Sequence, residues 1–114
     1  MPSAEIIAIG SELLLGQIVD TNSAWMAHRL NSLGMDLFYK TVVGDNPGRM
    51  KDAVNRALGR SDVVLTGGGL GPTQDDLTRE VIAEVTGREL VLIPELLDQI
   101  ERRFRSRGFV MTAN

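Results

Sequence analysis

The residues best suited to chemistry stand between an apolar run and a helix-like pattern. Val63, Val64 and Leu65 are β-branched or aliphatic, and apolar residues at helical spacing resume at Leu77. Between them, four glycines within five positions are followed by two carboxylates: Gly67, Gly68, Gly69, Gly71, Asp75 and Asp76. Glycines allow positive φ and let a ligand approach backbone N–H groups, while a helix start adds a positive dipole end. The stretch therefore predicts a strand, an anion-binding turn and a helix.

This turn differs from the two common phosphate-binding patterns. No Gly-Lys-Ser/Thr closes it, and Pro72 or Gln74 stands where Gly-x-Gly-x-x-Gly needs its last glycine. Because carboxylates repel phosphate, a divalent cation between the two groups is expected, and Mg²⁺ prefers such oxygen ligands together with phosphate oxygens. The stretch favours a metal-bridged phosphate ester as the ligand.

A structural interpretation of the same residues needs no ligand. Thr73 or Asp75 can cap the helix, and both acids complement the helix dipole. For Asp75 and Asp76 alone this capping interpretation is favoured. The four glycines favour a ligand, because a cap needs one glycine at most.

Two other loops carry candidate polar residues. The connection at 10–23 is longer than a strand-to-helix loop needs, and its Glu12 is equally well explained as a solvated acid or as a site residue. In the second loop Asn46 can cap a helix with Pro47 at its first position. Asp45 is thereby left to point toward the carboxyl end of the sheet, where ligands of open α/β sheets bind.

Regular alternation of strands and helices must position these groups. We predict strands at 4–9, 35–43 and 62–66, and a short one at 90–93. Predicted helices begin at caps in 20–22 and end before Gly34, then span 47–59, about 77–86 and about 94–105. Trp25 is expected in the core or in an interface. The prediction is one α/β domain over 1–114 with a parallel sheet, incomplete because its last crossovers are missing.

Composition excludes several classes of function. The 114 residues carry a net charge of -3 and no basic patch, which argues against nucleic acid as a partner. The absence of cysteine removes disulfides, thiolate metal sites and a cysteine nucleophile. Because no apolar run reaches membrane length and no signal pattern opens the chain, we expect a soluble, cytoplasmic protein without membrane contact.

Three stretches, taken together, resemble one family. They are residues 9–22, residues 43–47, and residues 67–78 with their Gly-Leu-Gly-Pro-Thr-Gln-Asp-Asp-Leu-Thr run. They resemble the amino-terminal domain of the competence/damage-inducible protein A (CinA) family, within the wider molybdopterin-binding superfamily of MoaB and MogA. The resemblance implies a three-layer α/β/α fold with a mostly parallel sheet and a homodimer. It also implies a hydrolase that cleaves ADP-ribose to AMP and ribose 5-phosphate with a divalent metal ion such as Mg²⁺.

Site roles follow from the resemblance, position by position. Asp45 and Asp76 are expected to hold the cation, while Asp75 or Glu12 orients the attacking water. The glycine turn at 67–71 is expected to hold phosphate together with two threonines, and the first pocket loop contributes an asparagine: Thr73, Thr78 and Asn22.

Members of this family usually continue beyond this length, which leads us to expect a truncated chain. They finish the first domain and often carry an amidohydrolase domain that acts on nicotinamide mononucleotide, an activity that these residues do not support. Two alternatives stay open: a molybdopterin- or nucleotide-binding module of cofactor biosynthesis, or a non-catalytic dimerisation fragment. The acid at position 75, where molybdopterin binders tend to carry a basic residue, argues against the first of these alternatives.

Overall fold

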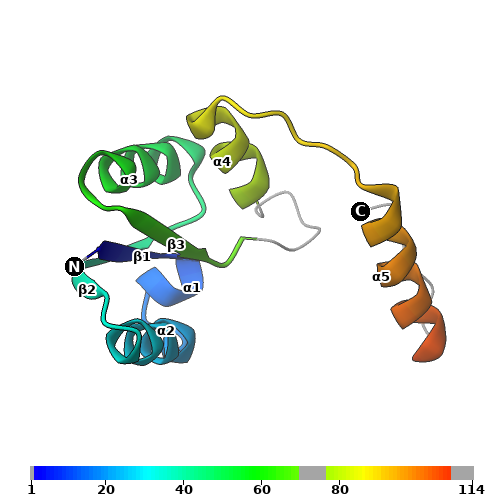
Figure 1. Cartoon of the computed structure of the whole chain (residues 1–114), viewed down its shortest axis with the longest axis horizontal. Coiled ribbons are helices and arrows are strands. Elements are labelled where there is room, and N and C mark those ends of the chain that lie inside the picture. Colours follow the sequence, from blue (N-terminus) through cyan, green and yellow to red (C-terminus); the bar gives the residue numbers. More distant parts are fainter. Residues whose placement is uncertain (1, 70–76, 109–114) are drawn as a thin grey trace.

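Three parallel strands form the sheet at the centre of the protein. A computed structural model describes residues 2–69 and 77–108. The strands β1 (Ser3–Ile9), β2 (Asp36–Val43) and β3 (Val63–Gly67) lie in the order β2-β1-β3, so the first strand is central (Figure 1). Both pairings are parallel. The three predicted strands at 4–9, 35–43 and 62–66 are therefore confirmed.

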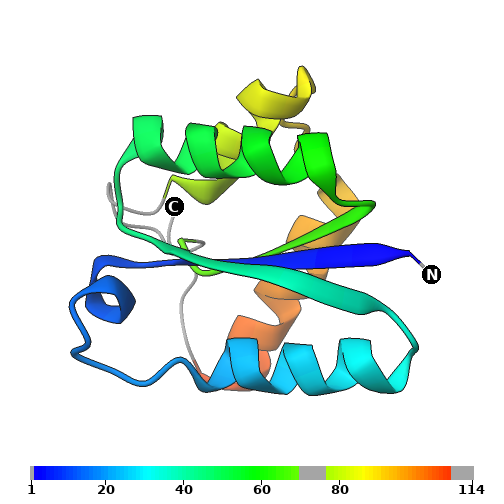
Figure 2. The same ribbon diagram turned by 90° about the vertical axis from the view of Figure 1, so that its left-hand side faces the viewer.

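Helices cover both faces of this sheet. In Figure 2, α3 (Pro47–Arg60) and α4 (Thr78–Thr86) lie on one side and α2 (Thr21–Ser32) on the other. Because side chains alternate along a strand, β1 supplies both cores. Ile7 and Ile9 pack with Met50 and Val54 of α3, while Ala4 and Ile6 pack with Leu30 of α2. The three-layer α/β/α fold is confirmed.

Several helix ends follow the predicted chemistry, but the predicted cap of α4 was wrong: α4 begins after Leu77, which makes no side-chain capping hydrogen bond, so neither Thr73 nor Asp75 is its cap. The side chain of Asn46 accepts a hydrogen bond from Arg49 N at 3.0 Å, and Pro47 opens α3. Asp20 is the cap of α2, and Gly87, with φ 66°, ends α4. The helix α3 runs one residue further than predicted, through Gly59 to Arg60.

Three predictions about the remaining segments need correction. Residues 90–93 form no strand: the side chains of Leu90 to Ile93 are exposed, and β-propensity without a neighbouring strand does not make one. Residues 11–14 form a short helix, α1 (Ser11–Leu14), inside the stretch predicted as a loop. Trp25 is 65% exposed, so it does not lie in the core, and its alternative placement in an interface stays a prediction.

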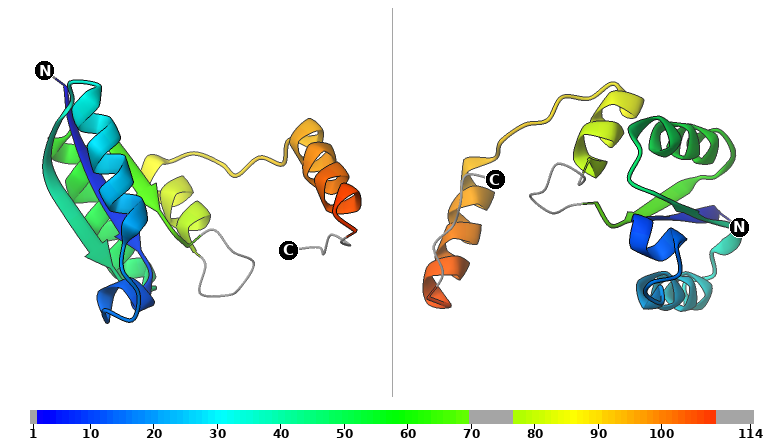
Figure 3. Two further views of the ribbon diagram at one scale, coloured as in Figure 1. Left: turned by 90° about the horizontal axis from the view of Figure 1, so that it is seen from below. Right: turned by 180° about the vertical axis from the view of Figure 1, so that it is seen from behind.

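The last helix, α5 (Pro94–Ser106), agrees with the predicted span and lies away from the sheet (Figures 1 and 3). An extended segment connects it to α4. Its apolar side chains Leu97, Ile100 and Phe104 are partly exposed. No helix in 2–69 or 77–108 is long and apolar enough to cross a bilayer.

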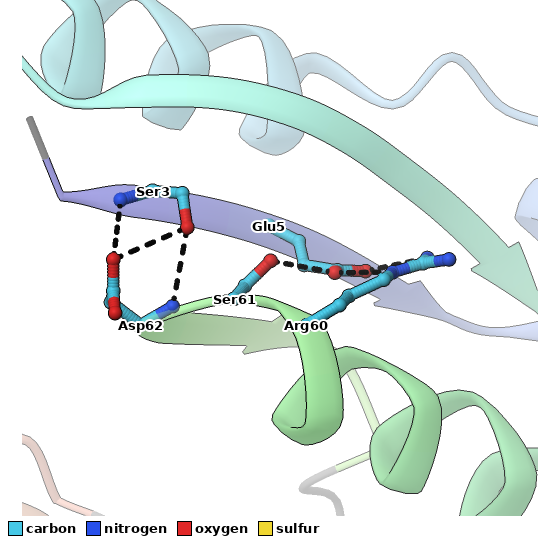
Figure 4. A network of polar contacts seen from close by, with 5 residues as sticks. All are labelled: Ser3, Glu5, Arg60, Ser61 and Asp62. Atoms are coloured by element: carbon cyan, nitrogen blue, oxygen red, sulfur yellow. Dashed lines mark hydrogen bonds and ion pairs between the residues drawn. The ribbon is translucent and has the colours of Figure 1, made fainter.

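A buried carboxylate fixes the amino-terminal edge of the sheet. Glu5 on β1 is fully buried and accepts hydrogen bonds from Arg60 Nε at 2.7 Å, Arg60 Nη2 at 2.9 Å and Ser61 Oγ at 2.7 Å (Figure 4). The Arg60 guanidinium also stacks 3.5 Å from the ring centroid of Tyr39. The hydrogen bonds from Arg60 hold the pKa of Glu5 below its ordinary value, against the opposing effect of burial. Glu5 therefore links the central strand to the end of α3.

Candidate functional site

The candidate site lies at the carboxyl ends of the strands. The chain leaves β1 toward α2 on one face of the sheet and leaves β3 toward α4 on the other (Figure 2). β1 and β3 are neighbours, so their following segments diverge and open a crevice at a topological switch point. In open α/β sheets ligands bind at such a point.

A cavity of about 220 Å³ lies at this crevice. Ala8 and Ile9 of β1 and Gly67 and Gly68 at the end of β3 form its floor, and residues from 12 to 26 form its wall. The wall is apolar on one part and polar on another. Its apolar members are Leu13, Ile18, Val19 and Met26; its polar members are Glu12, Asp20, Thr21, Asn22 and Ser23.

The glycine turn approaches the end of β1 closely. Gly68 has φ 101°, and a Cβ placed on it would lie 2.1 Å from the carbonyl oxygen of Ile9. Gly69 has φ 69°, and a Cβ there would lie 2.0 Å from Thr78 Oγ1. Both positions therefore exclude every side chain, by conformation and by space. The predicted glycine turn adjoins the cavity, with Gly67 and Gly68 as lining residues.

Thr78 holds this turn from the start of α4. The residue is 1% exposed, its Oγ1 donates to the Gly68 carbonyl at 2.8 Å, and its N–H donates to the Gly69 carbonyl at 3.2 Å. The Thr78 hydroxyl, which was predicted to hold phosphate, donates its hydrogen bond to a carbonyl of the protein. Direct phosphate contact by Thr78 stays a prediction.

Two of the predicted acids, Glu12 and Asp45, follow neighbouring strands, but their side chains have different surroundings. Glu12 on α1 is exposed and lines the cavity. Asp45 follows β2, accepts a hydrogen bond from Ser11 N at 3.1 Å through Oδ2, and donates its own N–H to Ser11 Oγ at 3.2 Å. These two reciprocal hydrogen bonds connect the end of β2 to the first residue of α1. Asp45 thus holds the helix that carries Glu12, although Asp45 does not line the cavity.

Asn22 also lines the cavity and lies in the first turn of α2. The cap Asp20 positions this turn, because it accepts from Ser23 N at 3.0 Å and from Ser23 Oγ at 2.5 Å. The hydrogen bond from the Ser23 hydroxyl, helped by that from the Ser23 amide, lowers the pKa of Asp20 against the effect of burial. Asp20 therefore remains a charged carboxylate at neutral pH, and contact of Asn22 with a ligand stays a prediction.

A cation site at Asp45 and Asp76 stays a prediction. They include no group of three histidine or carboxylate side chains close enough to hold a metal ion by themselves. Mg²⁺ in phosphate-binding sites often takes one or two protein carboxylates and completes its shell with water and phosphate oxygens. Among the described acids predicted for this site, Glu12 lines the cavity and Asp45 is hydrogen-bonded to Ser11. The other predicted site residues, Gly71, Thr73, Asp75 and Asp76, lie outside the described residues.

The apolar wall of the cavity was not predicted from the sequence. Ile18 and Val19 are more than half exposed, which is unusual for a loop unless it serves a ligand or a partner. The sequence feature that could have indicated them is the mixture of apolar and polar residues in the long connection at 10–23. In that connection only Glu12 and Asn22 were predicted as site residues.

The fold and the crevice together define the class: an open α/β/α protein with a small-molecule cavity where the connections diverge. Residues 5–114 match the family described as the probable molybdopterin binding domain, and the chain belongs to this family. A relative from Caldicellulosiruptor saccharolyticus, named putative competence-damage inducible protein, is 54% identical over 108 residues. Another of the same name, from Symbiobacterium thermophilum, is 51% identical over 111 residues.

These alignments cover 95% and 97% of the chain but 26% of each relative, so the chain spans about a quarter of their length. Among solved structures, protein CinA from Thermoplasma acidophilum matches 98% of the chain with a TM-score of 0.86 and 33% identity, over 64% of its own length. The molybdopterin biosynthesis enzyme MoaB from Thermus thermophilus matches 79% of the chain, and 58% of its own, with a TM-score of 0.72 and 25% identity. The resemblance to the CinA family is thereby confirmed.

Proposed function

We propose that the cavity binds a small molecule with a flat ring system and phosphate, a nucleotide or a pterin. The observation that carries this proposal is the cavity itself, which combines an apolar wall with the glycine turn. Its 220 Å³ falls below the usual range of about 300–1,000 Å³ for ligand pockets. It therefore encloses one ring system, packed against Ile18, Val19 and Met26, while the phosphate lies along the rim at the glycine turn.

The reaction proposed for the complete protein is metal-dependent hydrolysis of ADP-ribose. Water adds to one phosphorus of the diphosphate, the bridging P–O bond breaks, and AMP and ribose 5-phosphate leave. A bound divalent cation would neutralise charge on the diphosphate and lower the pKa of a bound water. Support comes from the resemblance of the glycine turn and the loops at 9–22 and 43–47 to the CinA family.

The residues of the site have separate roles in this proposed reaction. Backbone N–H groups of the turn donate to phosphate oxygens at the start of α4, where the helix dipole favours negative charge. Glu12, on the cavity wall, orients the attacking water or joins the cation. Asp45 holds Ser11 and thereby Glu12. A bound cation would be held by Asp45 and by Asp76, which lies outside the described residues.

Incubation of the chain, and of a longer family member, with ADP-ribose tests the reaction. We expect AMP only when Mg²⁺ is present, and at least tenfold less AMP with Glu12→Gln, because a positioned acid or base typically contributes a factor of about 10² to 10⁴. Glu89→Gln, at an exposed acid after the end of α4, is the matched control. Metal-independent AMP release, or equal effects of both substitutions, would contradict these roles.

A second candidate function is molybdopterin binding without turnover. It is favoured by the family description and by the likeness to MoaB, a molybdopterin biosynthesis enzyme. The pterin ring would pack against the apolar wall, and the phosphate of the pterin would bind at the same glycine turn. Tight pterin binding without AMP production from ADP-ribose would favour this candidate. The expected homodimer is a separate proposal, which sedimentation equilibrium of the chain tests directly.

A further inference from the structure

The turn after β3 is held from two sides. On one side Gly68 lies against the carbonyl oxygen of Ile9, so closely that a Cβ has no room. On the other side Thr78 donates to two successive carbonyls, Gly68 O at 2.8 Å and Gly69 O at 3.2 Å. Thr78 is a polar side chain with 1% exposure whose hydroxyl fills the space that a side chain on Gly69 would need.

These contacts orient one particular amide. In a trans peptide the C=O and the following N–H point in opposite directions. Because the Gly68 carbonyl points to Thr78 on α4, the Gly69 N–H of the same peptide points away from α4. The cavity lies on the side of the sheet covered by α2, opposite to α4. Among residues 2–69 and 77–108, no backbone carbonyl accepts a hydrogen bond from the Gly69 N–H.

We propose that Thr78 is a positioning residue of the ligand site, and that its hydroxyl turns the Gly69 N–H toward an anionic oxygen of the ligand. This rests on the proposed function, in which phosphate lies at the turn. In this role Thr78 acts through the Gly68 peptide, in place of the direct phosphate contact predicted from the sequence. Without the hydroxyl, the peptide between Gly68 and Gly69 is free to rotate, since glycine tolerates both orientations.

Substitutions at position 78 separate this role from a packing role. Thr78→Val keeps the branched shape and removes the hydroxyl, whereas Thr78→Ser keeps the hydroxyl and removes a methyl group. Thr86→Val is the matched control, because Thr86 Oγ1 donates to Ile82 O at 2.7 Å near the exposed end of the same helix. If Thr78→Val does not fold, Thr78→Ala replaces it.

Two measurements are compared across these variants. The first is the ¹⁵N–¹H shift of the Gly69 amide in the chain without added ligand; the second is the dissociation constant for ADP-ribose with Mg²⁺. We expect Thr78→Val to move the Gly69 resonance and to weaken ADP-ribose binding about tenfold or more, the value of one hydrogen bond to a charged group. Thr78→Ser is expected to restore both, and Thr86→Val to change neither.

An unchanged Gly69 resonance in Thr78→Val, or a serine variant as impaired as the valine variant, would overturn the proposal. If the wild type fails to bind ADP-ribose, the proposed substrate is wrong. The Gly69 resonance then still decides whether Thr78 positions the peptide, so the two failures are distinguishable.

Discussion

Gly68→Ala is the substitution whose effect is most directly fixed by the structure. The residue has φ 101°, a conformation that costs an alanine about 1–3 kcal/mol. The new Cβ would lie 2.1 Å from Ile9 O, although real Cβ contacts essentially never fall below 3.0 Å. The turn or the end of β1 must therefore shift by roughly 1 Å, and overpacking of this kind typically costs about 1–3 kcal/mol. Since the two costs partly overlap, we expect a loss of about 3 kcal/mol in the free energy of unfolding.

Urea unfolding followed by far-ultraviolet circular dichroism measures this loss. Gly59→Ala is the matched control, because Gly59 lies in α3 and a Cβ added to it would meet no atom within 4 Å. Alanine in a helix interior is favoured, so this variant should gain about 0.5–1 kcal/mol. A Gly68→Ala variant within about 0.5 kcal/mol of wild type would refute the close approach between the turn and β1.

Three further outcomes follow from individual contacts. The pKa of Glu5 is lowered in the folded state, so its stabilising contribution is present above the ordinary glutamate pKa and is lost as the pH falls through the lowered value. Between about pH 7 and pH 3 the wild type should lose more unfolding free energy than Glu5→Gln in urea titrations; equal losses would contradict the buried charge. Asp20→Ala removes the cap of α2 and should cost about 1 kcal/mol by chemical denaturation, an expectation that an unchanged midpoint would exclude. Met50→Ala, at a fully buried position, should cost about 2–5 kcal/mol, whereas Leu33→Ala, 68% exposed, should change the thermal midpoint little; similar shifts in both would show that the core is misplaced.

Local sequence signals determine much of this fold. The apolar run before Gly10, the cap Asn46 with Pro47, and the terminating Gly87 are each explained by neighbours within a few residues. The glycine turn was predicted from clustered glycines between an apolar run and a helical pattern. These signals act through backbone conformation and helix ends, so a single sequence contains them.

Tertiary contacts account for what the sequence did not reveal. Glu5 reads as one polar residue in a buried strand, and its partner Arg60 is 55 positions away. The role of Asp45 depends on Ser11, which follows another strand. Residues 90–93 show the opposite failure: their apolar, β-branched pattern predicted a strand, but pairing depends on a neighbour rather than on propensity.

The most direct test of the account is a titration of the ¹⁵N-labelled chain with ADP-ribose in the presence of Mg²⁺, followed amide by amide. If the crevice between β1 and β3 binds the ligand, shifts will concentrate at Gly68, Gly69 and the wall residues from Glu12 to Ser23, and they will saturate together. Saturating shifts elsewhere on the protein, or none at the glycine turn with ADP-ribose and with a phosphorylated pterin alike, would contradict the proposed site.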